Sequence, residues 1–199
     1  MTKLRVLFML AFMVFSFLAF ASLASAQEMK KGDKAWTELE ATLRDANLRW
    51  LCQGKYYKPK RQDCVDARAK FWADQFFEMG QGSGTQTKAQ MVAGQTAGAK
   101  TYSEVVRGEG PNPTDFKLMA VYGNFAMATD HTSFKTRLDS AGKPDFAHGP
   151  ANSDTGHWFL DDTGKLAVVR EVTFLRLFVK ENGEWRPAAG ASVPVPPTK

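Results

Sequence analysis

The pattern of apolar and polar residues changes its period once along the chain. Between residues 33 and 77 the apolar residues recur every three or four positions, which is typical of helices that bury one face. From residue 102 onwards apolar residues alternate with polar ones, which is typical of half-buried strands. The pattern predicts helices over residues 33–53, 64–77 and 87–97, followed by about five or six strands.

The clearest pair of strands lies between residues 168 and 193. Aliphatic, aromatic and β-branched residues fill nearly every position of 172–179, and such residues favour strands. Asn182 and Gly183 follow, and this pair tolerates the positive φ angles of a two-residue hairpin turn. Pro187, early in the returning strand, predicts a strand start or a bulge because proline donates no ladder hydrogen bond.

A second hairpin is predicted where Gly123 and Asn124 separate residues 115–122 from residues 125–134. Turn-forming residues bound the remaining segments, which are short strands at 102–107 and 156–160 and loops at 55–62, 79–86 and 140–155. The predicted helices therefore all precede the main strands. This segregation predicts an α+β fold class, with the N-terminal helices packed on one face of an antiparallel sheet.

The first residues have the features of a targeting segment. Lys3 and Arg5 precede an apolar run, and Ala24-Ser25-Ala26 fits the small-residue cleavage rule. We therefore expect a signal peptide over 1–26, one domain over 27–193 and a proline-rich tail over 194–199. A retained membrane anchor is the alternative, because about 18 apolar residues can span a bilayer. A cleaved signal would place the domain in the periplasm or outside the cell, without a membrane partner.

The charge balance argues against a nucleic-acid partner. The formal net charge is +5, and it falls to about +3 once Lys3 and Arg5 leave with the signal peptide. The basic cluster at residues 58–61 is short, whereas proteins that bind nucleic acid concentrate many basic residues on one face.

The two cysteines, Cys52 and Cys64, predict one disulfide if the chain is exported, because oxidising compartments favour cystine. The alternative is a pair of buried, unpaired thiols. A zinc site is not expected, since no histidine is close in sequence to either cysteine and two thiolates do not complete a zinc shell. We expect no metal and no cofactor.

Four local patterns resemble one known family. They are a long first helix followed by a helix ending in Trp72-Ala73-Asp74-Gln75-Phe76, the segment 84–91 (GTQTKAQM), the hairpin over 116–129, and the terminal Asn182-Gly183-Glu184-Trp185-Arg186. Together these patterns resemble the SnoaL-like branch of the nuclear-transport-factor-2-like superfamily, over residues 36–193. The resemblance implies a cone in which a curved antiparallel sheet and the N-terminal helices enclose an apolar pocket. What this pocket does varies widely within the superfamily. We expect a small apolar ligand here and a homodimer formed through the exposed sheet face.

Enzymes of this superfamily use an Asp, His or Tyr inside the cone as a general base or hydrogen-bond donor. The resemblance therefore gives two sets of candidates, which are His131, His157 and Asp74 for catalysis and Tyr102, Tyr122, Trp158 and Arg176 for ligand binding. Each has a simpler interpretation: His131 as a polar strand residue, His157 as an edge residue, Asp74 as a turn residue. Arg176 interrupts an apolar strand face, so its charge must be paired or exposed, for instance in a surface or inter-subunit ion pair.

Three functions are compatible with these residues. The leading hypothesis is an exported domain that binds a small, largely apolar molecule in its cone. The second is a cofactor-free isomerase or dehydratase that uses His131 or His157 as its base. The third is a protein-interaction module without ligand chemistry. An inward-pointing histidine would favour the enzyme, and a filled interior would favour the interaction module.

Overall fold

The computed structural model describes residues 29–80, 84–101, 103–104, 110–137, 141–143 and 166–194. Its elements follow in the order α2 (Lys34–Leu51), η1 (Gly54–Tyr56), α3 (Arg61–Phe71), β1 (Phe77–Gly80), β2 (Gly84–Thr87), α4 (Lys88–Thr101), β3 (Gly110–Tyr122), β4 (Phe125–Arg137), β5 (Leu166–Glu181) and β6 (Glu184–Pro194). The predicted signal peptide, the strand at 156–160 and most of the segments at 102–107 and 140–155 lie outside the described residues.

The helix predicted over residues 33–53 is confirmed as α2. Asp33 precedes it at the N-cap position, and Cys52 ends it in a left-handed conformation with φ 56°. The N–H groups of Cys52 and Gln53 then bond the carbonyls of Arg49 and Leu48, which satisfies carbonyls that a helix end would leave free. The helix therefore ends one residue before the disulfide cysteine.

The prediction of a helix over residues 64–77 was wrong at both ends. Helix α3 ends at Phe71, and Trp72 is already extended, with ψ 144°. The N–H of Ala73 bonds the carbonyl of Pro187 in β6, so the chain leaves the helix to reach the sheet. The rings of Trp72 and Phe76 then stack with centroids 4.3 Å apart. The spacing of apolar residues alone does not show that Trp72 and Phe76 lie beyond the end of the helix.

The prediction of a loop over residues 79–86 was also incomplete. Strands β1 and β2 form a short antiparallel pair on either side of residues 81–83. Strand β1 also runs parallel to β6, where Phe77 is opposite Ala189 and Met79 is opposite Ala191. Strand β6 lies more than 100 residues after β1 in the chain, so no local sequence pattern predicts β1 and β2. After β2 the chain enters α4 through a reciprocal cap, in which Thr87 N–H bonds Gln90 Oε1 and Gln90 N–H bonds Thr87 Oγ1.

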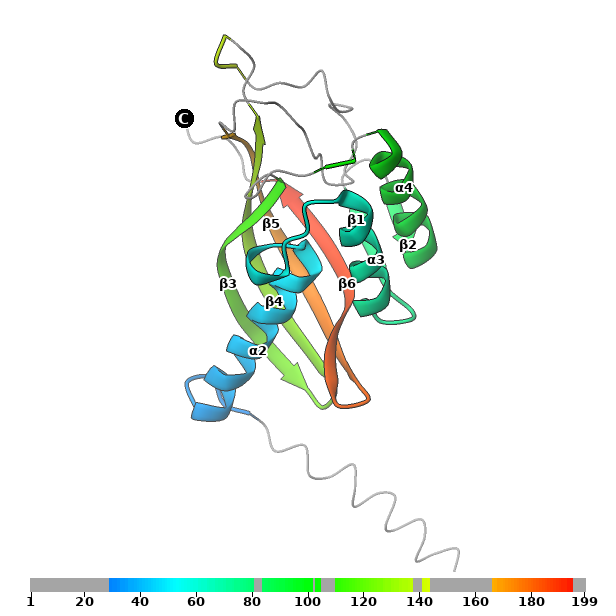
Figure 1. Ribbon diagram of the computed structural model, residues 1–199. Coiled ribbons are helices and arrows are strands. Elements are labelled where there is room, and N and C mark those ends of the chain that lie inside the picture. Colours follow the sequence, from blue (N-terminus) through cyan, green and yellow to red (C-terminus); the bar gives the residue numbers. More distant parts are fainter. Residues whose placement is uncertain are drawn as a thin grey trace, which may run out of the picture.

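The six strands form one curved, unclosed sheet in the order β2-β1-β6-β5-β4-β3. The prediction of a curved antiparallel sheet with helices on one face is confirmed, with the difference that β1 and β6 are parallel. Four register shifts interrupt the long strands, and such bulges increase the twist and bend of a strand. One of them lies opposite Pro187, as its sequence position predicts. Figure 1 shows the strands curving around α2, with α3 and α4 beside β6.

Both predicted hairpin turns are present. Asn182 and Gly183 have φ angles of 52° and 82°, as a two-residue turn with two positive φ angles requires. The turn at Gly123 has φ 58° and joins β3 to β4, whose end residues Tyr122 and Phe125 pair directly.

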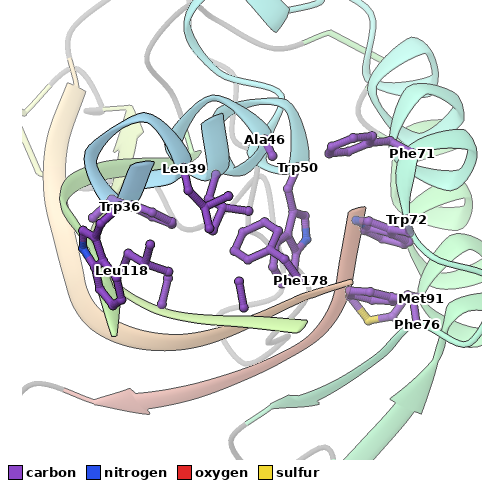
Figure 2. Close-up of a cluster of buried hydrophobic side chains, with 14 residues drawn as sticks. Trp36, Leu39, Ala46, Trp50, Phe71, Trp72, Phe76, Met91, Leu118 and Phe178 are labelled. Carbon is purple, nitrogen blue, oxygen red and sulfur yellow. The ribbon is translucent and has the colours of Figure 1, made fainter. Parts of the chain in front are cut away.

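The core lies between α2 and the concave face of the sheet. Trp50 meets Phe76 and Phe178 edge to face, with ring centroids 5.4 and 6.2 Å away. Figure 2 shows the α2 side chains pointing at the strands, while Phe71, Trp72 and Phe76 approach from the α3 side. Gly190 in β6 lies under Trp50, where a Cβ atom would be 3.0 Å from the Trp50 ring. A side chain at this position would therefore require the Trp50 ring to shift.

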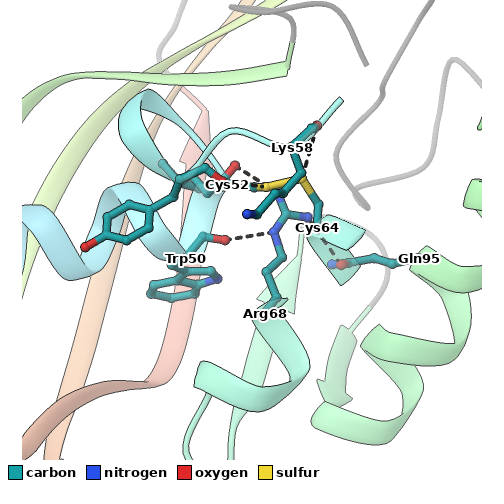
Figure 3. Close-up of a disulfide and its surroundings, with 8 residues drawn as sticks. Trp50, Cys52, Lys58, Cys64, Arg68 and Gln95 are labelled. Atoms are coloured by element: carbon teal, nitrogen blue, oxygen red, sulfur yellow. Dashed lines mark hydrogen bonds between the residues drawn. A yellow bond between two sulfur atoms is a disulfide. The ribbon is translucent and has the colours of Figure 1, made fainter. Parts of the chain in front are cut away.

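The predicted disulfide is confirmed: it joins Cys52, just after α2, to Cys64 in the first turn of α3. Beside it, Arg68 of α3 donates hydrogen bonds to the carbonyls of Trp50 and Leu51 at 2.8 and 2.9 Å. Figure 3 shows the bond to the Trp50 carbonyl. A cross-link and a buried arginine thus fix the end of α2 relative to α3.

We predict that Gly190→Ala lowers the free energy of unfolding by about 1–3 kcal/mol, because the neighbours of Trp50 prevent the ring from moving away. Gly94→Ala is the matched control. Gly94 lies in α4, and no described atom would approach an added Cβ within 4 Å. That substitution should stabilise the protein by about 0.5–1 kcal/mol. Urea unfolding curves of both variants check the prediction, which fails if Gly190→Ala is neutral or stabilising.

Candidate functional site

A group of polar side chains is buried on the concave face of the sheet. Asp130 in β4 is 0% exposed and Arg176 in β5 is 1% exposed, and the Arg176 Nη2 atom lies 3.3 Å from Asp130 Oδ2. The same Oδ2 atom accepts hydrogen bonds from Asn47 Nδ2 of α2 and from Thr132 Oγ1, both at 2.9 Å. We call these four residues the interior polar cluster. The cluster joins α2 to the two central strands.

Strand geometry explains why these residues share one face. Residues 126, 128, 130 and 132 of β4 alternate with outward-facing positions, and all four are completely buried. Arg176 pairs with Ala128 across the ladder, so it lies diagonally beside Asp130 on the same face. Asn47 reaches the same face from the opposite layer, because α2 packs across this face of the sheet.

The interior polar cluster is not fully satisfied by the described part of the chain. Asp130 Oδ1, Asn47 Oδ1 and Arg176 Nε are buried and have no hydrogen-bond partner there. An unpaired polar atom in a protein interior costs about 1–3 kcal/mol, and more when it belongs to a charged group. Native proteins rarely keep three such atoms together unless another molecule contacts them.

Two aromatic rings flank the Arg176 guanidinium. Its Cζ atom lies 4.2 Å from the Trp50 ring centroid and 3.9 Å from that of Phe174. Burial lowers the pKa of Arg176, and the nearby Asp130 carboxylate acts in the opposite direction. Stacking and the ion pair therefore hold one charged group at a fixed place in an apolar interior.

A second buried arginine lies deeper towards the disulfide. Burial lowers the pKa of Arg68 to about 10, helped by the positive charges of Arg61 and Arg176 and opposed by Glu78. Arg68 is still charged at neutral pH. Its hydrogen bonds go to backbone carbonyls of α2 and to Gln95, so it serves the fold.

The predicted site residues within the described ranges lie apart from one another. Arg176 lies inside the cone. His131 is on the opposite face of β4, with its Nε2 atom 3.7 Å from Glu171. The Asp74 side chain is 95% exposed, 3.7 Å from Lys88, and Tyr122 is 72% exposed at a turn. Tyr102, His157 and Trp158 lie outside the described residues.

Sequence reasoning did not choose Asn47, Asp130 or Thr132 as site residues. The sequence did contain evidence for Asp130 and Thr132. Both occupy inward-facing positions of β4, in the alternating series that runs from Ala128 to Phe134. A carboxylate at an inward strand position needs a buried partner, and Arg176 interrupts the apolar phase of β5 in the same way. Asn47 gives no such signal, because a polar residue near the edge of a helix face is common.

A separate cleft of about 300 Å³ lies on the other side of α2, next to the β5–β6 turn. Its lining residues are Thr42, Asp45, Ala46, Arg49, Tyr56, Phe71, Gly183, Glu184 and Trp185. Arg49 bridges it, with Nη1 2.7 Å from Glu184 Oε1 and its guanidinium 4.0 Å from the Phe71 ring centroid.

At the η1 end of this cleft, Asp45 accepts hydrogen bonds from Tyr56 Oη at 2.5 Å and from Lys55 Nζ at 2.7 Å. Burial alone would raise the pKa of Asp45, but these two donors lower it below its ordinary value. The same hydrogen bond to Asp45 raises the pKa of Tyr56.

In the described ranges, no three His, Cys, Asp or Glu side chains are grouped so that they could hold a metal ion. None of the helices in those ranges has the length and apolar character needed to cross a membrane.

No family model and no curated protein matches the chain. Solved structures are similar at low identity. A Novosphingobium aromaticivorans protein, provisionally assigned as an aromatic ring hydroxylase, is 12% identical with a TM-score of 0.54, over 81% of this chain and 92% of its own. A Streptomyces avermitilis protein, provisionally assigned as a dehydratase of the NTF2-like family, is 14% identical with a TM-score of 0.52, over 79% and 97%. An NTF2-like Pseudomonas putida protein of unknown function is 11% identical with a TM-score of 0.50, over 82% and 97%.

These similarities show the fold: the chain has the NTF2-like fold, in which helices pack on a curved sheet. The SnoaL-like branch in particular stays a prediction. At such low identity the neighbours carry no function over to this chain, because one fold supports many activities.

We predict that Asp45→Asn lowers the free energy of unfolding at neutral pH by about 0.5–1 kcal/mol, a small value because the pair is partly exposed. The pKa of Asp45 is lowered in the folded state, so its contribution is complete above the unfolded pKa and is lost as the pH falls through the folded pKa. The difference from wild type should therefore shrink as the pH falls through the ordinary range of a carboxylate and disappear below the folded pKa of Asp45. Asp74→Asn, at a highly exposed site, is the control. A pH-independent difference would contradict the prediction.

Proposed function

We propose that this NTF2-like domain is exported and binds a small, largely apolar molecule between α2 and the concave face of its sheet. The interior polar cluster would contact one polar group of that molecule. The observation that supports the proposal is the set of three buried polar atoms, on Asn47, Asp130 and Arg176, that lack a partner in the described part of the chain.

The chemistry of these atoms limits the polar group of the ligand. Asp130 Oδ1 and Asn47 Oδ1 are acceptors, whereas Arg176 Nε–H is a donor. A hydroxyl group both donates and accepts, so one hydroxyl could serve an acceptor and the donor together. The neighbouring apolar side chains, Val172, Phe134 and Phe174, form a small buried cluster of their own, which favours an apolar body for the ligand.

The described residues do not support proton transfer by His131 or Asp74. His131 lies on the outer face of β4 and Asp74 is exposed, so neither reaches the interior polar cluster. A general base must be within hydrogen-bond distance of the proton that it removes.

Export is supported by the sequence of residues 1–26 and is compatible with the Cys52–Cys64 disulfide. A periplasmic or secreted location is therefore part of the proposal.

A homodimer through the outer sheet face is a further part of the proposal. Outward-facing apolar residues of β1 and β5 lie there on either side of small residues of β6, since Phe77 and Leu177 both pair with Ala189, and Met79 and Leu175 both pair with Ala191. Phe77, Met79 and Leu175 are exposed. Apolar patches of this kind are typical of interfaces, and a second copy of the chain offers a matching apolar surface.

The ligand is tested by native mass spectrometry of the full-length protein purified from its own compartment. We predict a bound small molecule in wild type and an occupancy at least about tenfold lower in Asp130→Asn, which removes a charged acceptor. Thr132→Val is a milder variant that removes one hydrogen bond to Asp130. Asp115→Asn, at an exposed ion pair, is the control. A wild-type protein without any bound molecule, or equal occupancy in Asp130→Asn, would sink the proposal.

The dimer is tested by sedimentation velocity. We predict that Leu175→Lys converts a wild-type dimer to a monomer at micromolar concentration, because it puts a charge into an apolar interface. Ala97→Lys, on the exposed side of α4, should leave the dimer unchanged. A monomeric wild type, or a Leu175→Lys variant that remains dimeric, contradicts this interface.

A further inference from the structure

The cleft beside the β5–β6 turn combines aromatic walls with one arginine. Tyr56 comes from η1, Phe71 from the end of α3 and Trp185 from the start of β6, so three separate elements bring aromatic rings to it. Its volume of about 300 Å³ is at the lower end of the range for small-molecule sites. This cleft is separate from the interior polar cluster, which lies under the opposite face of α2.

Arg49 is held in a conformation suited to binding an anion. Its guanidinium stacks on the Phe71 ring, and its side chain remains 38% exposed. A planar guanidinium held in this way can present two N–H groups to a carboxylate. Its present partner, Glu184, also accepts a hydrogen bond from Arg186 Nη2 at 3.2 Å. Glu184 therefore keeps one cationic partner if Arg49 turns to a ligand.

The exchange of partners costs little. An exposed ion pair such as Arg49–Glu184 contributes only about 0–1 kcal/mol, so a ligand carboxylate in the same position can compete with Glu184. The cleft offers no comparable site for a cationic ligand, because both acids already have two partners. Asp45 accepts hydrogen bonds from Lys55 and Tyr56, and Glu184 is paired with two arginines.

The charged residues around the cleft also favour an anionic ligand over a cationic one. Four basic side chains, Arg49, Lys55, Lys180 and Arg186, line it or contact its lining residues. Three acids do the same, which are Asp45, Glu184 and the residue paired with Glu184 across the hairpin, Glu181. The excess is positive, which attracts anions. The aromatic walls add a preference for a planar apolar body, because rings stack offset or edge to face.

We propose that this cleft is a second binding site, and that it binds small aromatic carboxylates, with the carboxylate on Arg49 and the ring against Trp185 and Tyr56. The Arg49–Glu184 pair closes the empty site. A bound carboxylate takes the place of Glu184 on the Arg49 guanidinium, and no covalent step is involved.

The experiment titrates the full-length protein with three probes of one shape, which are 1-naphthoate, 1-naphthamide and 1-naphthylmethylammonium. Binding is followed by NMR shifts of the Trp185 indole N–H and the Gly183 amide, and affinities are measured by calorimetry. We expect naphthoate to bind at least tenfold more tightly than either other probe. The shifts should be confined to the cleft and should not include the Trp50 indole.

Two substitutions should change the naphthoate affinity in opposite directions. Arg49→Gln removes the cation and should weaken binding at least tenfold, whereas Glu184→Gln removes the competing carboxylate and should strengthen it several-fold. Both side chains are partly exposed, so both variants should fold. Asp130→Asn should leave the naphthoate affinity unchanged, which separates this site from the cone. Equal binding of the three probes, parallel effects of the two substitutions, or shifts at Trp50 would each overturn the proposal.

Discussion

Trp50 connects the hydrophobic core of this protein with its buried charges. Its ring meets Phe76 and Phe178 edge to face, and the Arg176 guanidinium lies 4.2 Å from the same ring. Its carbonyl accepts a hydrogen bond from Arg68, which fixes the end of α2. Gly190 has no side chain, so the ring can lie directly on β6. Trp50 thus joins α2 to the sheet beside the interior polar cluster.

The interior combines charges in a way that stability alone does not require. A buried ion pair is often no more stabilising than apolar residues of the same volume, because both charges must lose their water. Asp130 and Arg176 also leave one acceptor and one donor without a described partner. A binding role explains why such a costly arrangement lies on the concave face, whereas the remainder of β4 there is small or apolar.

The sequence predicted the fold well wherever a local pattern determines the structure. The period of α2, the two hairpin turns, the bulge at Pro187 and the disulfide all follow from residues close together in the chain. The short strands β1 and β2 were missed because their pairing depends on β6. The end of α3 was misplaced because Ala73 bonds to Pro187, a contact between distant segments.

The candidate site could be predicted only in part for the same reason. Arg176 was identified because a charge stood out in an apolar strand. Its partners Asp130 and Asn47 come from β4 and α2, and only the register of the sheet and the crossing of α2 bring them together. His131 follows Asp130 directly, yet the alternation of strand side chains places it on the opposite face. His131 is thus kept out of the interior only because it is one position further along β4 than Asp130.

A crystal structure of the protein purified from its own compartment would decide whether the interior polar cluster is a binding site. We predict electron density for a molecule other than water, with a polar atom about 2.7–3.2 Å from Asp130 Oδ1 or Asn47 Oδ1. Apolar side chains packed directly against these two oxygens, with no density between them, would contradict a binding role and leave the cluster as a purely structural element.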